Sequence, residues 1–158
     1  MIAVSELRNS GIEESSDLAE LAAEAERFLL AHRKWCRGVK AGYFDRGLSK
    51  VAVFFFEIDP VPPADPTVWV IVGDLPAAYM DTSSCPNGAT ALDGYVGAMR
   101  EWVNAVLTGT STKDLIPVLV TGSWVPVEPN KHMAEQLRGR LDFIDAEILP
   151  QWKDELDA

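Results

Sequence analysis

The sequence predicts a single α+β domain, residues 1–158, in which an antiparallel sheet of three to five strands packs with about three α-helices. Two apolar segments rich in β-branched and aromatic residues, Val51–Ile58 and Thr67–Val72, indicate central strands. The proline-rich connection between them cannot continue either strand, so it predicts a reversal of the chain. With 158 residues and 47% hydrophobic content, the chain is long enough for one core and too short for two.

The first part of the chain predicts an arm followed by a helix. Residues 1–16 contain few apolar side chains, which is typical of a short and poorly ordered arm. Asp17, followed three residues later by Glu20, predicts the start of an amphipathic helix over residues 18–33. The apolar positions of this helix recur at helical spacing: Leu18, Leu21, Ala22, Ala25, Phe28, Leu29 and His32.

The middle of the chain predicts a three-stranded meander. Val39–Phe44 has strand composition, and the short glycine-containing link Asp45–Ser49 predicts a hairpin with Val51–Ile58. The connection Asp59–Pro66 is long enough to return the chain antiparallel as Thr67–Val72. Neither face of the two central strands is polar, so we expect protein on both sides of the sheet. If helices cover one face, a long loop or a second subunit must cover the other, and we therefore predict a symmetric homodimer.

The second half of the chain predicts two more helices. Ala77–Thr90 has the composition of a long loop, and Leu92–Leu107 follows it with a clear helical stripe that ends near Gly109. Leu115–Val120 is apolar but interrupted by a proline, which suits an edge strand. A last helix is expected to begin near Pro129, and its apolar face ends at Ile148.

The charge of the chain bounds its partners. Its 14 basic and 24 acidic residues give a net charge of −10, and an acidic chain of this kind repels nucleic acid. The one basic island, residues 31–50, spans a helix end and a strand, so its cations are expected to be solvated in several directions. No apolar run approaches the roughly 20 residues that cross a bilayer, and the N-terminus does not have the pattern of a secretory signal. We therefore expect a cytoplasmic protein with no nucleic-acid or membrane partner.

The search for catalytic motifs is negative. The sequence contains no dinucleotide-binding or phosphate-binding glycine motif, no zinc-protease motif, no nucleophile elbow and no calcium loop. His32 and His132 have no cysteine or histidine at metal-ligand spacing, so no metal is expected. Cys36 and Cys85 are too few for a disulfide framework and are expected to be free thiols. The sequence therefore assigns no cofactor and no catalytic residue.

A small hydrolase is the alternative function, and two features favour it. Cys85 shortly precedes a predicted helix whose dipole would lower a thiol pKa and favour a nucleophile, although an inert loop cysteine fits the same pattern. Asp59, Asp74 and Asp81 follow strand ends, where paired carboxylates can serve acid–base or metal chemistry. An aspartate in this position is also the usual turn residue, which accepts backbone hydrogen bonds.

Aromatic residues outside the predicted core favour a binding role. Tyr79, Trp124 and Trp152 fall in loop or terminal stretches, where they either form a protein interface or cap the ends of the core. Exposed aromatics beside carboxylates supply anchoring and steering together. The leading hypothesis is therefore a non-enzymatic protein-binding role with a basic protein partner, and with Asp74, Tyr79, Asp81 and Trp124 near the contact.

One segment carries a resemblance to known proteins. The run VWVIVGDLP at Val68–Pro76, with Tyr79 and the helix around Tyr95–Val103, resembles a family of small uncharacterised bacterial proteins from Trp35 onward. That resemblance implies no particular activity. In size, acidity, tryptophan content and α+β pattern, the chain is also similar to immunity proteins that neutralise bacterial toxins. This similarity implies a partner that is blocked by steric and electrostatic occlusion.

Overall fold

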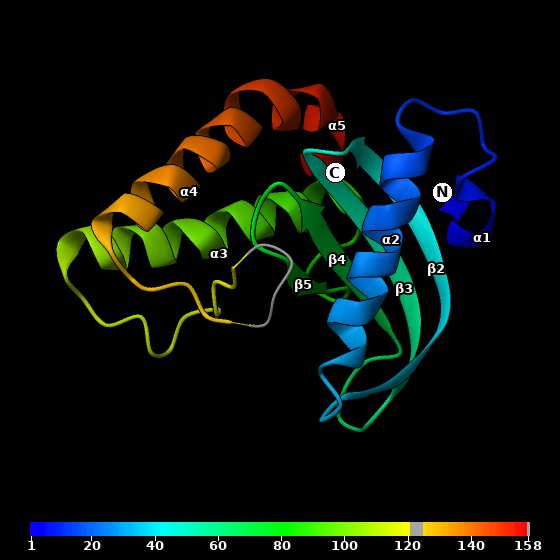
Figure 1. Cartoon of the computed structure of the whole chain (residues 1–158), viewed down its shortest axis with the longest axis horizontal. Helices are drawn as coiled ribbons and strands as arrows, with labels where there is room; N and C mark the ends of the chain where they lie inside the picture. Colours follow the sequence, from blue (N-terminus) through cyan, green and yellow to red (C-terminus); the bar gives the residue numbers. More distant parts are fainter. Residues whose placement is uncertain (121–124, 158) are drawn as a thin grey trace.

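A computed structural model describes residues 1–120 and 125–157, and in that part of the chain it shows a five-stranded antiparallel sheet with helices on both faces (Figure 1). The strands are β1 Ile2–Ala3, β2 Cys36–Leu48, β3 Val51–Pro60, β4 Thr67–Gly73 and β5 Ala78–Asp81, and their order in the sheet is their order in the chain. The helices are α1 Val4–Leu7, α2 Ser15–Leu30, α3 Gly88–Thr108, α4 Lys131–Phe143 and α5 Lys153–Leu156. The predicted α+β class is confirmed.

The predicted central meander is confirmed, and its first strand is longer than expected. β2 pairs with β3 from Cys36 to Leu48, and β3 pairs with β4 along the whole of β4. The pairing of β2 with β3 contains three register shifts, so the 13 residues of β2 lie alongside the ten residues of β3. Such β-bulges leave single residues out of the ladder and re-aim their side chains. One of them, Asp45, becomes important below.

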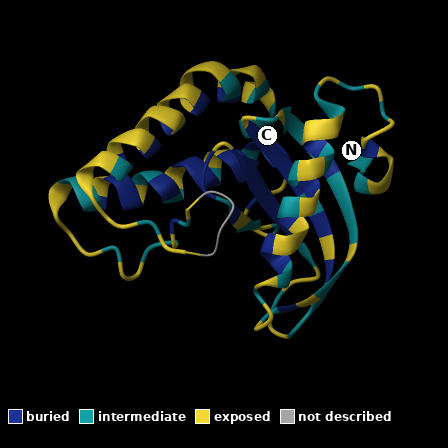
Figure 2. Cartoon of the chain, viewed as in Figure 1, coloured by how far each residue is buried: buried dark blue, intermediate teal, exposed yellow. Residues whose placement is uncertain are grey.

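Helices cover both faces of the sheet, which gives the protein two apolar cores (Figure 2). α3 covers one face, with α4 packed against α3, and α1 and α2 cover the other face. The first core takes Val51, Val53, Trp69 and Ile71 from the central strands, and the second takes Ala52, Phe54, Phe56, Ile58, Val68, Val70 and Val72. Our reason for predicting a homodimer was an uncovered sheet face, and the described helices supply that cover. The homodimer itself stays a prediction.

The N-terminal segment belongs to the fold instead of forming the expected arm. Ile2 and Ala3 pair with Phe44 and Tyr43 of β2 as the first edge of the sheet. Leu7 of α1 is fully buried in the core beneath α2. A few apolar residues are enough to order this segment, because they pair with the edge of β2 and pack against the core. These contacts are with residues distant in the sequence, so the local composition does not indicate them.

The segment Ala77–Thr90 is not one long loop. Its first part is β5, which pairs with β4, and its last part begins α3. The amide of Thr90 donates to the Asn87 side chain at 2.9 Å, and the Asn87 amide is 3.2 Å from the Thr90 hydroxyl. These reciprocal bonds form a capping box, so Asn87 was a helix-start signal within a stretch that otherwise has loop composition.

The predicted edge strand Leu115–Val120 is wrong. In the described chain this segment forms one isolated bridge, between Leu119 and Pro126, and it does not join the sheet. The amide of Val127 donates to the Val118 carbonyl at 2.8 Å, so the segment pairs locally with its own continuation. Pro117 lacks an amide hydrogen, which disfavours a longer ladder.

The last helix is divided into several parts. Asn130 caps α4, whose helical residues end at Phe143. A π-helical segment, Ile144–Ile148, and a 3-10 segment, Leu149–Trp152, then lead into α5. Pro150 lies in the 3-10 segment, where its missing amide donor prevents a regular helix from continuing. Across the described residues, no helix combines the length and the apolar character needed to cross a membrane.

Candidate functional site

Of the three predicted contact residues that lie in the described part of the chain, the structure brings two close together. Tyr79 and Asp81 lie two residues apart on β5 and therefore on the same face of the sheet. Asp81 pairs with Val68 near the start of β4, whereas Asp74 follows the other end of that strand, about 20 Å away at the rise of a β-strand. Trp124, the fourth predicted contact residue, lies outside the described residues.

The carboxylate of Asp81 is held by the turn that follows it. Its Oδ1 accepts hydrogen bonds from the Ser83 amide at 2.6 Å and the Ser83 hydroxyl at 2.5 Å, and its Oδ2 accepts the Ser84 hydroxyl at 2.6 Å. These bonds lower the pKa of Asp81 to about 2, and the bond from the Ser83 hydroxyl has the largest effect. Asp81 therefore carries a permanent charge at neutral pH and acts as the turn residue that its position suggested.

Asp74 also has a structural partner. Its carboxylate lies 3.6 Å from Nη2 of Arg140, and its backbone carbonyl accepts a hydrogen bond from Arg140 Nε at 2.8 Å. Both side chains are substantially exposed, so this pair contributes little to stability. Asp74 joins the end of β4 to α4 and stands apart from Tyr79.

Tyr79 belongs to a cluster of four aromatic rings, Phe28, His32, Trp35 and Tyr79, which we call the aromatic cap. The ring centroids of Tyr79 lie 4.8 Å from Trp35 and 5.3 Å from His32, and His32 lies 4.8 Å from Phe28. Phe28 is buried, His32 and Trp35 are half-buried, and Tyr79 is 39% exposed. The cap closes the core at the end of α2 and also leaves Tyr79 exposed to solvent, so a capping role and an interface role of Tyr79 are compatible.

The end of α2 positions the cap. Phe28 and His32 are one helical turn apart, which places both rings on the same side of the helix. The chain then turns tightly, since the His32 carbonyl accepts the amides of Trp35 and Cys36, and this turn brings the indole of Trp35 against Tyr79. The sequence predicted Tyr79 alone, because the partners of its ring come from segments more than 40 residues away.

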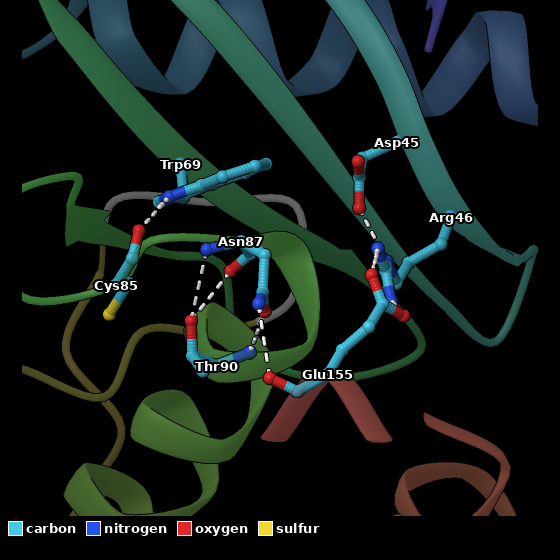
Figure 3. Close-up of polar contacts among 7 residues, drawn as sticks. All are labelled: Asp45, Arg46, Trp69, Cys85, Asn87, Thr90 and Glu155. Atoms are coloured by element: carbon cyan, nitrogen blue, oxygen red, sulfur yellow. Dashed lines mark hydrogen bonds and ion pairs between the residues drawn. The ribbon is translucent and has the colours of Figure 1, made fainter. Parts of the chain in front are cut away.

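Cys85 does not have the properties of an activated nucleophile. Its side chain is buried, and burial, followed by the nearby charges of Asp81 and Asp93, raises the pKa of its thiol. Its carbonyl accepts a hydrogen bond from the indole Nε1 of Trp69 at 2.8 Å (Figure 3). Cys36 is also a free and buried thiol, so the expectation of two free thiols is confirmed.

We expect iodoacetamide at pH 8 to label Cys85 at least about tenfold more slowly in the native protein than in guanidinium, because the thiolate is the reactive form and burial disfavours it. A Cys36→Ser variant isolates the signal of Cys85, and mass spectrometry of timed samples gives the rate. Native labelling as fast as that of the unfolded chain would restore Cys85 as a candidate nucleophile.

A polar cluster connects the C-terminus to the sheet and to α3; we call it the C-terminal clamp, and its side chains are Asp45, Arg46, Asn87 and Glu155 (Figure 3). Arg46 Nε donates to Asp45 Oδ2 at 2.5 Å, and its two terminal nitrogens donate to the two oxygens of Glu155 at 2.5 and 2.8 Å. The Asn87 side-chain amide donates to the Glu155 carbonyl at 3.1 Å. The bidentate bond with Glu155 is the main cause that raises the pKa of Arg46.

The clamp depends on the third bulge of β2. Asp45 is the residue left out of the ladder between Phe44 and Arg46, so its carboxylate is re-aimed toward the start of α3. A Cβ atom on Gly88 would lie 1.9 Å from Asp45 Oδ2, so a larger residue at this first position of the helix would displace the clamp side chains. Arg46 bonds to both carboxylates, and the clamp therefore holds β2 and the start of α3 to the C-terminal α5.

Within the described ranges, no group of three or more His, Cys, Asp and Glu side chains gathers as metal ligands would.

Comparison with known proteins finds no matching family model, curated protein or solved structure. The resemblance to small bacterial proteins and the similarity to immunity proteins therefore stay predictions.

Proposed function

We propose that this protein has a non-enzymatic binding role and contacts a basic protein partner through the aromatic cap. The observation that carries this proposal is the convergence of rings from α2, the following turn and β5 into one partly exposed cluster beside Asp81. Tyrosine and tryptophan are enriched among the few residues that carry most of the binding energy at protein interfaces, because they bury a large area and lose little conformational freedom. Tyr79 and Trp35 are the anchors of this proposal.

The charges around the cap favour a basic partner and one orientation of that partner. Asp17, Glu20 and Glu26 are exposed along α2, which leads to the cap, and the whole chain carries −10. Such a surface speeds the encounter with a basic partner. Arg33 and Lys34 are exposed in the turn beside the cap, so one side of its rim is basic and the Asp81 side is acidic. This asymmetry supports one orientation of the partner over its reverse.

An immunity or antitoxin-like role is the specific form of the proposal. A toxin with a basic surface would be occluded by an acidic protein that covers it. The alternative, a small hydrolase that uses Cys85 or paired aspartates, has less support. The Cys85 thiol is buried with a raised pKa, and Asp81 is held by two serines.

The test is affinity capture from the native organism, followed by binding kinetics with Tyr79→Ala. We expect Tyr79→Ala to weaken binding by about tenfold or more, as the loss of an interface anchor does. Phe143→Ala is the matched control, because Phe143 is 43% exposed and Tyr79 is 39% exposed, and Phe143 does not belong to the cap. Rising salt should slow association steeply and change dissociation less.

Three results would contradict this proposal. The captured partners would be neutral or acidic, or association would not depend on salt, or Phe143→Ala would weaken binding while Tyr79→Ala would not. The third result would move the contact away from the cap without removing the binding role.

A further inference from the structure

A groove of about 790 Å³ lies between the turn that joins β2 to β3 and the C-terminal helical segments. Its volume is within the range of small-molecule sites in proteins. Its apolar surface includes Leu48, which is 44% exposed, and Phe143, which is 43% exposed. Val51, Ile148 and Trp152 extend that surface. The groove is distinct from the aromatic cap, because none of the residues that line it belongs to the cap.

Two unusual backbone features border the groove. Glu14 has left-handed backbone angles, φ 58° and ψ 27°, although it is not glycine. The segment Ile144–Ile148 is π-helical, and its last two residues also line the groove. Both conformations cost free energy and concentrate at functional sites. Their meeting at one groove is an observation separate from its volume.

The aromatic walls of the groove already attract cations. The Arg46 guanidinium carbon lies 4.9 Å from the centroid of the Trp152 ring, and the Lys50 ammonium lies 5.5 Å from that of Phe143. Arg46 is fixed by Asp45 and Glu155 in the C-terminal clamp. Lys50 is exposed, and within the part of the chain that the structure describes it forms no ion pair. The Lys50 side chain can therefore leave its ring at little cost.

The charges at the groove are complementary to a cation. The charged lining residues are Glu14, Arg46, Lys50 and Glu147, and Asp45 and Glu155 stand behind Arg46. Since Asp45 and Glu155 already pair with Arg46, the lining carboxylates Glu14 and Glu147 face one remaining lining cation, Lys50. Both oxygens of Glu14 accept hydrogen bonds from Ser49, at 2.9 Å from its amide and 2.7 Å from its hydroxyl. Glu147 is exposed and lines the groove without that constraint.

We propose that the groove binds an organic cation with an apolar body, and that this cation displaces the Lys50 ammonium from the face of Phe143. Aromatic faces together with carboxylates recognise alkylammonium groups, and the apolar walls accept the body of the ligand. Lys50 is an internal competitor for the same ring. The proposal does not depend on the binding role of the aromatic cap.

Three probes with the same eight-carbon chain test the charge preference: octyltrimethylammonium, octyl sulfate and octanol, each below its micelle concentration. Calorimetry gives affinities, and nuclear magnetic resonance of labelled protein locates the contact. We expect the ammonium probe to bind most tightly and to shift the amides of Leu48 and Phe143 and the indole of Trp152. Equal or tighter binding of octyl sulfate, or shifts confined to other regions, would overturn the proposal.

Variants then test the displacement. Lys50→Gln should strengthen binding of the ammonium probe by about two- to fivefold, because it removes the competing cation. Glu147→Gln should weaken it by about twofold. Lys40→Gln is the control, since Lys40 is an exposed lysine of β2 outside the groove lining, and it should leave the affinity unchanged. Weaker binding by Lys50→Gln would overturn the proposal.

A second copy of this chain is the competing occupant of the groove, and the same resonances detect it. Spectra of the free protein at low and high concentration should be identical at Leu48, Phe143 and Trp152. Shifts with protein concentration, together with a dimer in sedimentation, would assign the groove to self-association and overturn the proposal.

Discussion

Replacing Trp69 by alanine should lower the free energy of unfolding by about 3–5 kcal/mol, as truncation of a buried aromatic residue does. Trp69 is 4% exposed and lies in the core between the sheet and α3. Its ring makes an edge contact with Phe55 at 5.0 Å, and its indole donates to the Cys85 carbonyl. The substitution therefore creates a cavity and also leaves a buried carbonyl without its donor.

Denaturant unfolding followed by far-ultraviolet circular dichroism measures this loss without using tryptophan fluorescence. Phe55→Ala is the matched control, because Phe55 lies on the same face of the sheet but is only half-buried. Its loss should be clearly smaller than that of Trp69→Ala. A loss below about 1 kcal/mol for Trp69→Ala would mean that the ring is exposed, and would contradict this packing.

The central sheet was predictable because its signal is local and repeated. Val51–Ile58 and Thr67–Val72 are apolar on both faces, and strands with that pattern need cover on both sides. The structure supplies this cover with helices from opposite halves of the chain. Gly109 was also predictable as the end of α3, because it adopts the left-handed angles that favour glycine there.

Features that depend on distant contacts were not predictable from the sequence. β1 contains two residues, and it is a strand because it pairs with the edge of β2, about 40 residues away in the sequence. β5 is four residues long within a segment of loop composition. Of the predicted contact residues, Tyr79 and Asp81 share a face, but the rings that surround Tyr79 come from α2 and the turn after it. Hydrophobic periodicity predicts each helix or strand separately, and it does not predict which helices and strands contact one another.

The C-terminal clamp is the clearest example of contacts that the sequence did not predict. Arg46 belonged to a basic island that we expected to be solvated, yet its side chain is only 16% exposed. Its partner Glu155 lies 109 residues away in the sequence, in the C-terminal α5. The bulge at Asp45 has no signal in local composition, so neither the direction of Arg46 nor its partner followed from the sequence.

Replacing Arg46 by methionine should lower the free energy of unfolding by about 1–3 kcal/mol, because it removes a bidentate, half-exposed ion pair and leaves the carboxylates of Asp45 and Glu155 without their shared cation. The variant should also change the acid response. Arg46 lowers the pKa of Glu155 below its ordinary value of 4.5, so this contact stabilises the fold above that pH and is lost as the pH falls through the lowered value.

Unfolding at pH 7 and along an acid series measures both effects, and Arg140→Met is the matched control. Arg140 pairs with Asp74 at 3.6 Å, but both side chains are largely exposed, so its loss should stay below about 1 kcal/mol. Below pH 4.5 the stability of Arg46→Met should fall less steeply than that of the wild type, because its Glu155 has lost the partner that lowered its pKa. Equal losses from the two arginine variants would show that the ion pair of the clamp acts as a surface pair, and that α5 is held by other contacts, such as the packing of Trp152 and Leu156 and the bond from Asn87 to the Glu155 carbonyl.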